Sequence, residues 1–253
     1  MRARPINRIR SVSFSGIDGA GKSTQIRSLC HRLKQDGLKV RLITFWDDVA
    51  TLTGMREATG HKIFKGDKGI GSPSAPINRR DKNVRSPLMT CMRLCIYLLD
   101  ALSMRRVSAK ALRSDADMVI FDRYTYDELA NLNLRNWVIR AYIRLIMRLV
   151  PRPHVSFLLD ADPLQARARK PEYPLEFLCS NRQSYLQLST LIGGMTVISP
   201  MPVEDVERQI LEHTLNRSGF GEVRKEKNRE PVLTAITSQP EQLDRPPTHS
   251  AAN

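Results

Sequence analysis

The stretch that decides the fold reads Gly16-Ile17-Asp18-Gly19-Ala20-Gly21-Lys22-Ser23-Thr24. It matches the pattern G-x-x-x-x-G-K-[ST] in full, and both flanks agree with that pattern. Residues 11–15 alternate polar and apolar side chains like a strand, and residues 24–33 carry apolar side chains at helical spacing. Backbone N–H groups of such a loop, with the amino end of the following helix, form a cradle for phosphate. The sequence therefore predicts a phosphate-binding loop between a strand and a helix.

Each part of this phosphate loop has an expected role. Lys22 can reach the β- and γ-phosphates of a nucleotide, and the Ser23 hydroxyl can hold Mg²⁺. ATP and Mg²⁺ are therefore the expected cofactors. The residues expected to bind the nucleotide are Gly16, Asp18, Gly19, Ala20, Gly21, Lys22, Ser23 and Thr24.

Length and composition limit the classes of protein to which this chain can belong. The chain has 253 residues with 41% hydrophobic side chains, which suits one α/β domain with additions. No apolar run is long enough to cross a bilayer, and the basic N-terminus lacks the apolar segment of a secretory signal. The four cysteines lack zinc-site spacing, which favours free thiols in a reducing compartment. We therefore expect a cytoplasmic protein without a membrane partner.

The formal net charge of +14 raises the question of nucleic-acid binding. However, the basic residues are spread over the whole chain and do not alternate with aromatic side chains as a stacking platform requires. An enzyme that handles phosphate also needs many Arg and Lys side chains. Nucleic acid is therefore a disfavoured partner, although a kinase acting on nucleic-acid ends stays open.

The apolar pattern predicts strands that alternate with helices. The expected strands are 11–15, 39–45, 117–122, 155–160 and 196–199, and the expected helices are 24–33, 88–112, 126–149, 163–169, 175–191 and 203–215. Such alternation predicts a parallel sheet with right-handed crossovers. The expected fold class is α/β, a P-loop kinase fold with a five-stranded parallel sheet and helices on both faces. Ligands should lie at the carboxyl edge of that sheet.

Three segments fall outside this pattern. Residues 1–9 form a basic N-terminal extension, and residues 219–253 are a polar tail expected to be disordered. Residues 47–87 are rich in Gly, Pro, Lys and Arg, so this variable basic loop either closes over an anionic acceptor or is simply mobile. We expect residues 10–218 to form the P-loop domain.

A second chemical element, Asp122-Arg123-Tyr124, follows the third expected strand directly. A carboxylate at that position can bind Mg²⁺, directly or through water. An arginine beside it can clamp the transferring phosphoryl group. We therefore expect Asp122 to share the metal with Ser23, and Arg123 to be catalytic together with Lys22.

The phosphate loop with its Ile17-Asp18 pair and the Asp-Arg-Tyr triplet resembles the thymidylate kinase family over about residues 10–215. The resemblance implies transfer of the γ-phosphoryl group of ATP to a nucleoside monophosphate, dTMP in the family, or to a related phosphate acceptor. In that family the equivalent of Asp18 faces the acceptor sugar, and the equivalent of Arg123 contacts the acceptor phosphate. A homodimer stays open.

Gly19 stands where some family members carry a catalytic arginine. Members without it use arginines of a lid that follows an Asp-x-x-Pro strand exit, here residues 160–163. The resemblance therefore implies a lid at residues 165–174, with Arg167 and Arg169 as catalytic candidates. The sequence does not decide which of the two points inward, and a basic helix end also suits the helix dipole. Arg182 is a further anion-binding candidate.

The acceptor half of the pattern departs from the family. The Glu-Pro-Gly element after the second strand is replaced by residues 45–49, and the Asp-Arg pair of the long helix is replaced by Asp100-Ala101. The serine and the Tyr-Gln pair after the Asp-Arg-Tyr triplet are absent, although Asn131 or Asn133 can bond a base edge. The sequence thus favours a kinase with an open choice of acceptor. The alternative is a nucleotide-binding, non-catalytic regulatory module.

Overall fold

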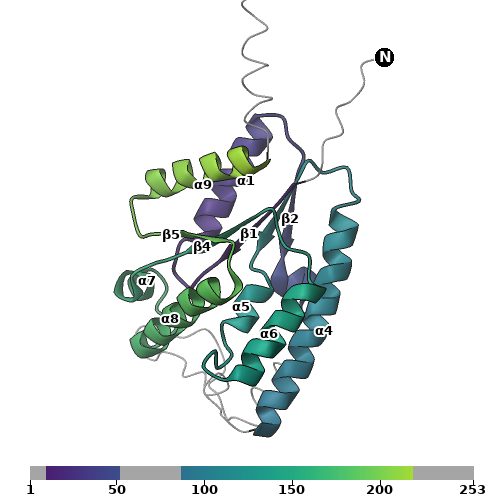
Figure 1. The fold of residues 1–253 in the computed structure, drawn as a ribbon. Helices are drawn as coiled ribbons and strands as arrows, with labels where there is room; N and C mark the ends of the chain where they lie inside the picture. Colours follow the sequence, from purple (N-terminus) through teal and green to yellow (C-terminus); the bar gives the residue numbers. More distant parts are fainter. Residues whose placement is uncertain (1–9, 52–86, 219–253) are drawn as a thin grey trace, which may run out of the picture. The chain divides into compact units, whose positions relative to one another are not determined.

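The computed structural model describes residues 10–51 and 87–218 (Figure 1). Within them, one parallel sheet contains β1 (Arg10–Ser15), β2 (Val40–Thr44), β3 (Met118–Asp122), β4 (Val155–Leu159) and β5 (Met195–Ile198). The strand order is β2-β3-β1-β4-β5. The predicted α/β fold with a five-stranded parallel sheet is therefore confirmed. Because β1 is the central strand, the phosphate loop emerges from the middle of the carboxyl edge.

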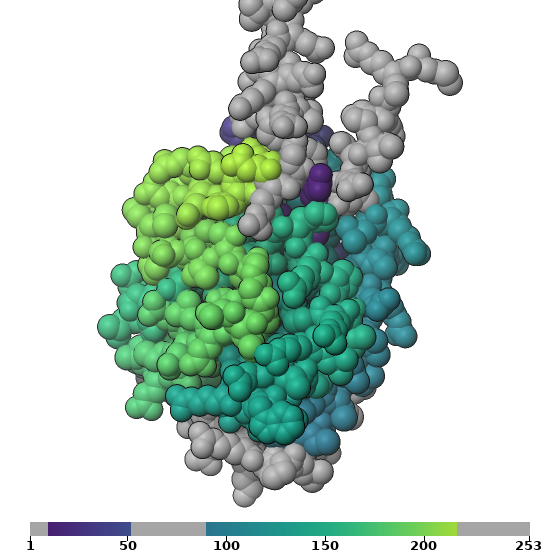
Figure 2. All heavy atoms as spheres, in the orientation of Figure 1, coloured from purple at the N-terminus to yellow at the C-terminus, as the bar shows by residue number. Residues whose placement is uncertain are grey.

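Helices surround this sheet (Figure 1). The described residues contain α1 (Lys22–Gln35), the π-helical turn η1 (Phe45–Val49) after β2, α4 (Pro87–Ala111), α5 (Thr125–Leu129), α6 (Trp137–Leu149), α7 (Pro163–Arg169), α8 (Leu175–Ile192) and α9 (Val203–Ser218). On the face drawn in Figure 2, α6 in teal and α8 in green lie at the surface.

The core forms because alternate strand residues point to opposite faces of the sheet. Val119 and Phe121 of β3 join one apolar cluster with buried side chains of α4, α5, α6 and α8. Helix α6 contributes Ile139 and Ile143 one turn apart, and both are buried. This packing fixes the carboxyl edge of the sheet, where the candidate site lies.

The single helix predicted over residues 126–149 is wrong. The structure has two helices, α5 and α6, with residues 130–136 between them. Helix α6 begins with its own cap, because the Asn136 side chain accepts a hydrogen bond from the backbone N–H of Val138 at 2.9 Å. The apolar pattern continues from α5 into α6, so it did not predict that a second helix begins at Trp137.

The expected extension at residues 1–9, the tail at 219–253 and most of the basic loop at 47–87 lie outside the described residues. The described start of that loop is anchored to α4, because Thr51 donates from its backbone N–H and its hydroxyl to Asp100 at 2.6 and 2.7 Å. In the described part of the chain, no helix is long and apolar enough to cross a membrane.

Candidate nucleotide-binding site

Helix α1 starts at Lys22 without a side-chain cap. Gly21 precedes it in the left-handed conformation, at a φ of 86°, which glycine adopts without strain. The first N–H groups of a helix have no intrahelical partners. Ser23 and Thr24 are exposed beside them. The helix start is therefore available to an anion, as the motif predicts.

Gly19 lies directly against helix α7. Its φ is 82°, and a Cβ atom at this position would lie 2.2 Å from the carbonyl oxygen of Ala166, which is fully buried. A separation under 3 Å from backbone cannot be relieved by rotating a side chain. The phosphate loop therefore has no room for an arginine, or for any other side chain, at position 19 while α7 occupies this place.

We expect Gly19→Ala to push α7 away from the loop and to weaken ATP binding. Overpacking against a backbone atom costs roughly 1–3 kcal/mol, in addition to the cost of a left-handed φ for alanine. Gly37→Ala is a matched control, because Gly37 also has a φ of 82° but nothing within 4 Å of its Cβ position. Calorimetric titration with ATP should show weaker binding for Gly19→Ala only. Equal affinities of the two variants would contradict the steric account.

Lys22 is buried within the phosphate loop. Its Nζ donates to the carbonyl oxygens of Gly16 and Ile17, each at 2.8 Å. Burial and, after it, the positive charge of Arg123 lower the pKa of Lys22 to about 8, although nearby carboxylates such as that of Asp18 oppose the change. The loop thus holds the ammonium group in place, and this group is expected to help the loop bind phosphate.

This lowered pKa predicts proton uptake on nucleotide binding. Near pH 8 a fraction of the Lys22 amines is neutral in the free protein. A phosphate beside the amine favours its charged form and raises its pKa, so ATP binding should draw in protons at pH 8 and fewer well below that pH. Calorimetry in two buffers of different ionisation enthalpy measures this uptake. Lys22→Arg, which is always charged, should abolish it, and unchanged uptake in that variant would refute the assignment to Lys22.

Arg123 lies between two carboxylates. Its Nη1 donates to Asp127 Oδ1 at 3.0 Å, and its Nη2 donates to Asp18 Oδ1. Burial acts to lower the pKa of Arg123, but the charges of Asp127 and Asp18 outweigh it and hold the pKa above its ordinary value. Arg123 also has a φ of 68°, which is costly for a residue with a side chain. The surrounding contacts therefore hold this residue in place.

The structure brings Asp18 of the phosphate loop into contact with Arg123 at the end of β3, and the acceptor-side role expected for Asp18 stays a prediction. Sequence reasoning missed Asp127 and Tyr185. Asp127 is buried and accepts hydrogen bonds from Ser15 Oγ at 2.7 Å and from the hydroxyl of Tyr185 at 2.8 Å. An acidic residue in the first turn of a helix signals only a helix start, and nothing in the sequence links it to a tyrosine 58 residues away.

Asp122 ends β3, next to Phe14 of β1 in the sheet register. Burial raises the pKa of Asp122, while Arg123 and Lys22 oppose that rise. Among the described residues, no group of three or more His, Cys, Asp or Glu side chains forms a metal site by itself. Mg²⁺ is commonly held by one or two carboxylates together with phosphate oxygens. Asp122 and Ser23 therefore fit a Mg²⁺ ion that arrives with a nucleotide.

Of the two lid arginines, Arg169 is the one that the described structure brings to the loop. Its Nη1 donates to the carbonyl oxygen of Gly19 at 3.0 Å, and its Nη2 donates to Gln165 at 3.3 Å. Arg167, at the same helix end, is half-buried. Arg182 of α8 makes a bidentate pair with Asp160, with N···O distances of 2.6 and 2.7 Å. This anion-binding candidate thus already has an anionic partner.

A cavity of about 540 Å³ lies beside the phosphate loop. Its lining comes from the loop and α1, the carboxyl end of β4, α7 and the connection from β5 to α9, and it includes Ala20, Thr24, Gln165, Arg169, Pro200 and Met201. The volume is in the range of small-molecule sites. The exposed guanidinium of Arg169 on its wall can stack on a planar ring. The cavity therefore suits the base of a nucleotide whose phosphates lie on the loop.

The two asparagines expected near an acceptor base are engaged locally. Asn131 Nδ2 donates to the backbone carbonyl of Asp127 at 2.8 Å, and Asn133 Oδ1 accepts from the backbone N–H of Arg135 at 3.2 Å. These bonds shape the connection between α5 and α6.

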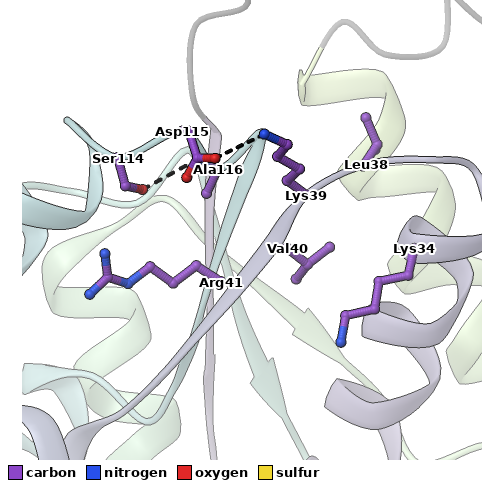
Figure 3. A pocket seen from close by; sticks show the side chains of 8 residues that line it. All are labelled: Lys34, Leu38, Lys39, Val40, Arg41, Ser114, Asp115 and Ala116. Atoms are coloured by element: carbon purple, nitrogen blue, oxygen red, sulfur yellow. Dashed lines mark hydrogen bonds and ion pairs between the residues drawn. The ribbon is translucent and has the colours of Figure 1, made fainter.

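A second cavity, of about 420 Å³, lies at the opposite edge of the sheet, where β2 and β3 begin (Figure 3). Lys39 and Asp115 form an ion pair there at 2.8 Å, and their side chains are 65% and 86% exposed. An ion pair that is so exposed to water contributes little to stability. This cavity is separated from the phosphate loop by the length of the strands, so it is not part of the candidate site.

The fold and the site define a P-loop nucleotide-binding protein of the α/β class. No protein-family model matches the chain. It is 28% identical over 206 residues to a probable thymidylate kinase of Methanothermobacter thermautotrophicus, covering 79% of this chain and 91% of the relative. It is 26% identical to probable thymidylate kinases of Archaeoglobus fulgidus (81% and 96% covered) and of Pyrococcus abyssi (79% and 93%). Over about four fifths of its length the chain is thus similar to proteins described as probable thymidylate kinases.

Proposed function

We propose that this protein is an ATP-dependent phosphotransferase that moves the γ-phosphoryl group of ATP to a nucleoside monophosphate, with dTMP as the first acceptor to test. The observation that carries the proposal is the convergence of three cationic side chains on one loop. Lys22 lies within the loop, Arg123 lies beside Asp18, and Arg169 contacts Gly19 from the lid. Phosphoryl transfer needs positioning and charge stabilisation more than covalent chemistry.

On the donor side, the phosphates of ATP would lie against the backbone N–H groups at the start of α1. The adenine base would occupy the cavity of about 540 Å³. Lys22 would leave the carbonyl oxygens of Gly16 and Ile17 to bind the phosphates. Mg²⁺, held by Ser23 and Asp122, would supply further positive charge. Arg169 and, on lid movement, Arg167 would stabilise the transferring group and exclude water.

On the acceptor side, Arg123 would bind the acceptor phosphate, and Asp18 would release Arg123 as that phosphate arrives. The choice of dTMP rests on the names of the relatives, which are probable thymidylate kinases. A homodimer stays open, and exposed Leu99 and Leu102 on α4 are the side chains to substitute when it is tested. The free thiols of Cys30, Cys91, Cys95 and Cys179 suit a reducing compartment such as the cytoplasm.

The test is ADP formation from ATP–Mg²⁺ with a panel of nucleoside monophosphates and nucleosides. We expect ADP release that requires an acceptor and is greatest with dTMP. ATP binding without acceptor-dependent ADP release from any member of the panel would overturn the proposal. That result would favour a nucleotide-binding regulatory module instead. Label transfer to the 5′ ends of oligonucleotides in preference to dTMP would favour an end kinase.

A further inference from the structure

Asp127 joins three separate parts of the candidate site. Its two oxygens accept from Ser15 Oγ of β1 at 2.7 Å, from the backbone N–H of Tyr124 at 3.1 Å, and from the hydroxyl of Tyr185 of α8 at 2.8 Å. The same carboxylate holds Arg123 Nη1 at 3.0 Å. Four donors therefore meet one carboxylate that is only 4% exposed.

Such burial makes the carboxylate immobile. A buried charge needs both its counter-ion and its hydrogen-bond donors, and the four donors leave Asp127 a single orientation. Tyr185 is itself buried, and burial together with the nearby charge of Asp127 raises the pKa of its phenol well above the usual value. The phenol therefore stays protonated and acts only as a donor to Asp127.

Helix α8 connects this group with the donor side of the site. Tyr185 lies one turn after Arg182, which forms the bidentate pair with Asp160 at the carboxyl end of β4. Asp160 also lines the cavity beside the phosphate loop. One helix thus holds Asp160 near the donor site with one side chain and Asp127 near Arg123 with another.

We propose that Asp127 is a positioning residue for Arg123, and that Tyr185 fixes Asp127 from α8. Asp127 holds the guanidinium from one side while Asp18 holds it from the other. When an acceptor phosphate displaces Asp18, Asp127 keeps Arg123 from following it. The guanidinium of Arg123 therefore keeps its direction toward the transferring phosphoryl group. Helix α8 keeps this guanidinium at a fixed position relative to the donor side of the site. This inference rests on the proposed function for its kinetic consequence, but not for the geometry of Arg123.

Tyr185→Phe tests the proposal with little change in packing. A hydrogen bond to a charged group is lost, so we expect kcat with dTMP to fall about tenfold, with a raised KM for dTMP and an unchanged KM for ATP. Asp127→Asn should lower kcat further, and the double variant should resemble Asp127→Asn alone, because both changes act through one contact. The matched control is Tyr142→Phe, which removes a phenol bond of 2.7 Å to the Leu94 carbonyl and no bond to Asp127 or Arg123 that the structure shows.

A second readout does not depend on turnover. Phenylglyoxal modifies accessible arginines, and mass spectrometry reports the rate at Arg123, whose side chain is 19% exposed. We expect slow modification in the wild type and in Tyr142→Phe, and faster modification in Tyr185→Phe and Asp127→Asn. Wild-type rates in both of these variants would overturn the inference, as would equal losses of kcat in Tyr185→Phe and Tyr142→Phe. If the wild type transfers no phosphoryl group, the proposed function fails, while the modification rates still decide the role of Asp127.

Discussion

Replacing Lys22 with alanine is expected to lower kcat for phosphoryl transfer by roughly 10²–10³-fold, the loss typical when one preorganised donor to a charged transition state is removed. Lys22 is the cation held within the phosphate loop, and its Nζ lies 2.8 Å from two loop carbonyls. Steady-state ADP formation with dTMP measures the loss. Binding of ATP should weaken as well, because the amine contacts the phosphates in the ground state.

The fold should survive this change. Burial and the charge of Arg123 lower the pKa of Lys22 to about 8, so the charged amine is disfavoured in the folded protein and its removal costs little stability. The thermal unfolding transition of Lys22→Ala should therefore lie close to that of the wild type. Lys34→Ala on the same helix is the control, since Lys34 is exposed and lines the distant cavity in Figure 3. Equal activities of the two variants would remove Lys22 from the mechanism.

The second large effect is expected at Arg123. Arg123→Ala should abolish measurable transfer, a loss of about 10³-fold or more by comparison with arginines that stabilise phosphoryl transfer. It should also destabilise the protein by roughly 3–5 kcal/mol, because Asp127 would remain buried without its cation. Chemical denaturation measures the stability, and ADP formation with dTMP measures the activity.

Arg123→Lys separates these two consequences. Lysine keeps the charge, so most of the stability should return, but it cannot form the two directed bonds that the guanidinium makes to Asp18 and Asp127. We expect a folded protein with strongly reduced transfer. Arg208→Lys on α9 is the matched control, since its ion pair with Asp205 is exposed. A fully active Arg123→Lys would show that charge alone suffices at this position.

Features carried by local sequence were predictable. The phosphate loop, its flanking strand and helix, and the five strands follow from spacing and apolar pattern, and the structure agrees within one residue at every strand end. The break between α5 and α6 was not predicted, because the apolar spacing continues across it and the decisive capping bond of Asn136 involves one side chain. A periodic apolar pattern extends over many residues and is easy to detect in a sequence, whereas a helix cap depends on a single side chain.

Features that depend on tertiary contacts were not predictable. The absence of an arginine at position 19 was visible in the sequence, but its steric cause, the carbonyl of Ala166, appears only when α7 is packed on the loop. The choice of Arg169 over Arg167 for the loop contact has the same origin. Asp127 and Tyr185 come together because α5 and α8 pack on each other, and no short motif encodes that meeting.

We propose that a phosphoryl group is transferred to a nucleoside monophosphate on the loop that contains Lys22. The direct test is incubation with γ-labelled ATP, Mg²⁺ and dTMP, followed by separation of the nucleotides. We expect label in dTDP that depends on added dTMP and disappears in Lys22→Ala. Saturated binding of ATP and dTMP with no labelled dTDP would contradict it.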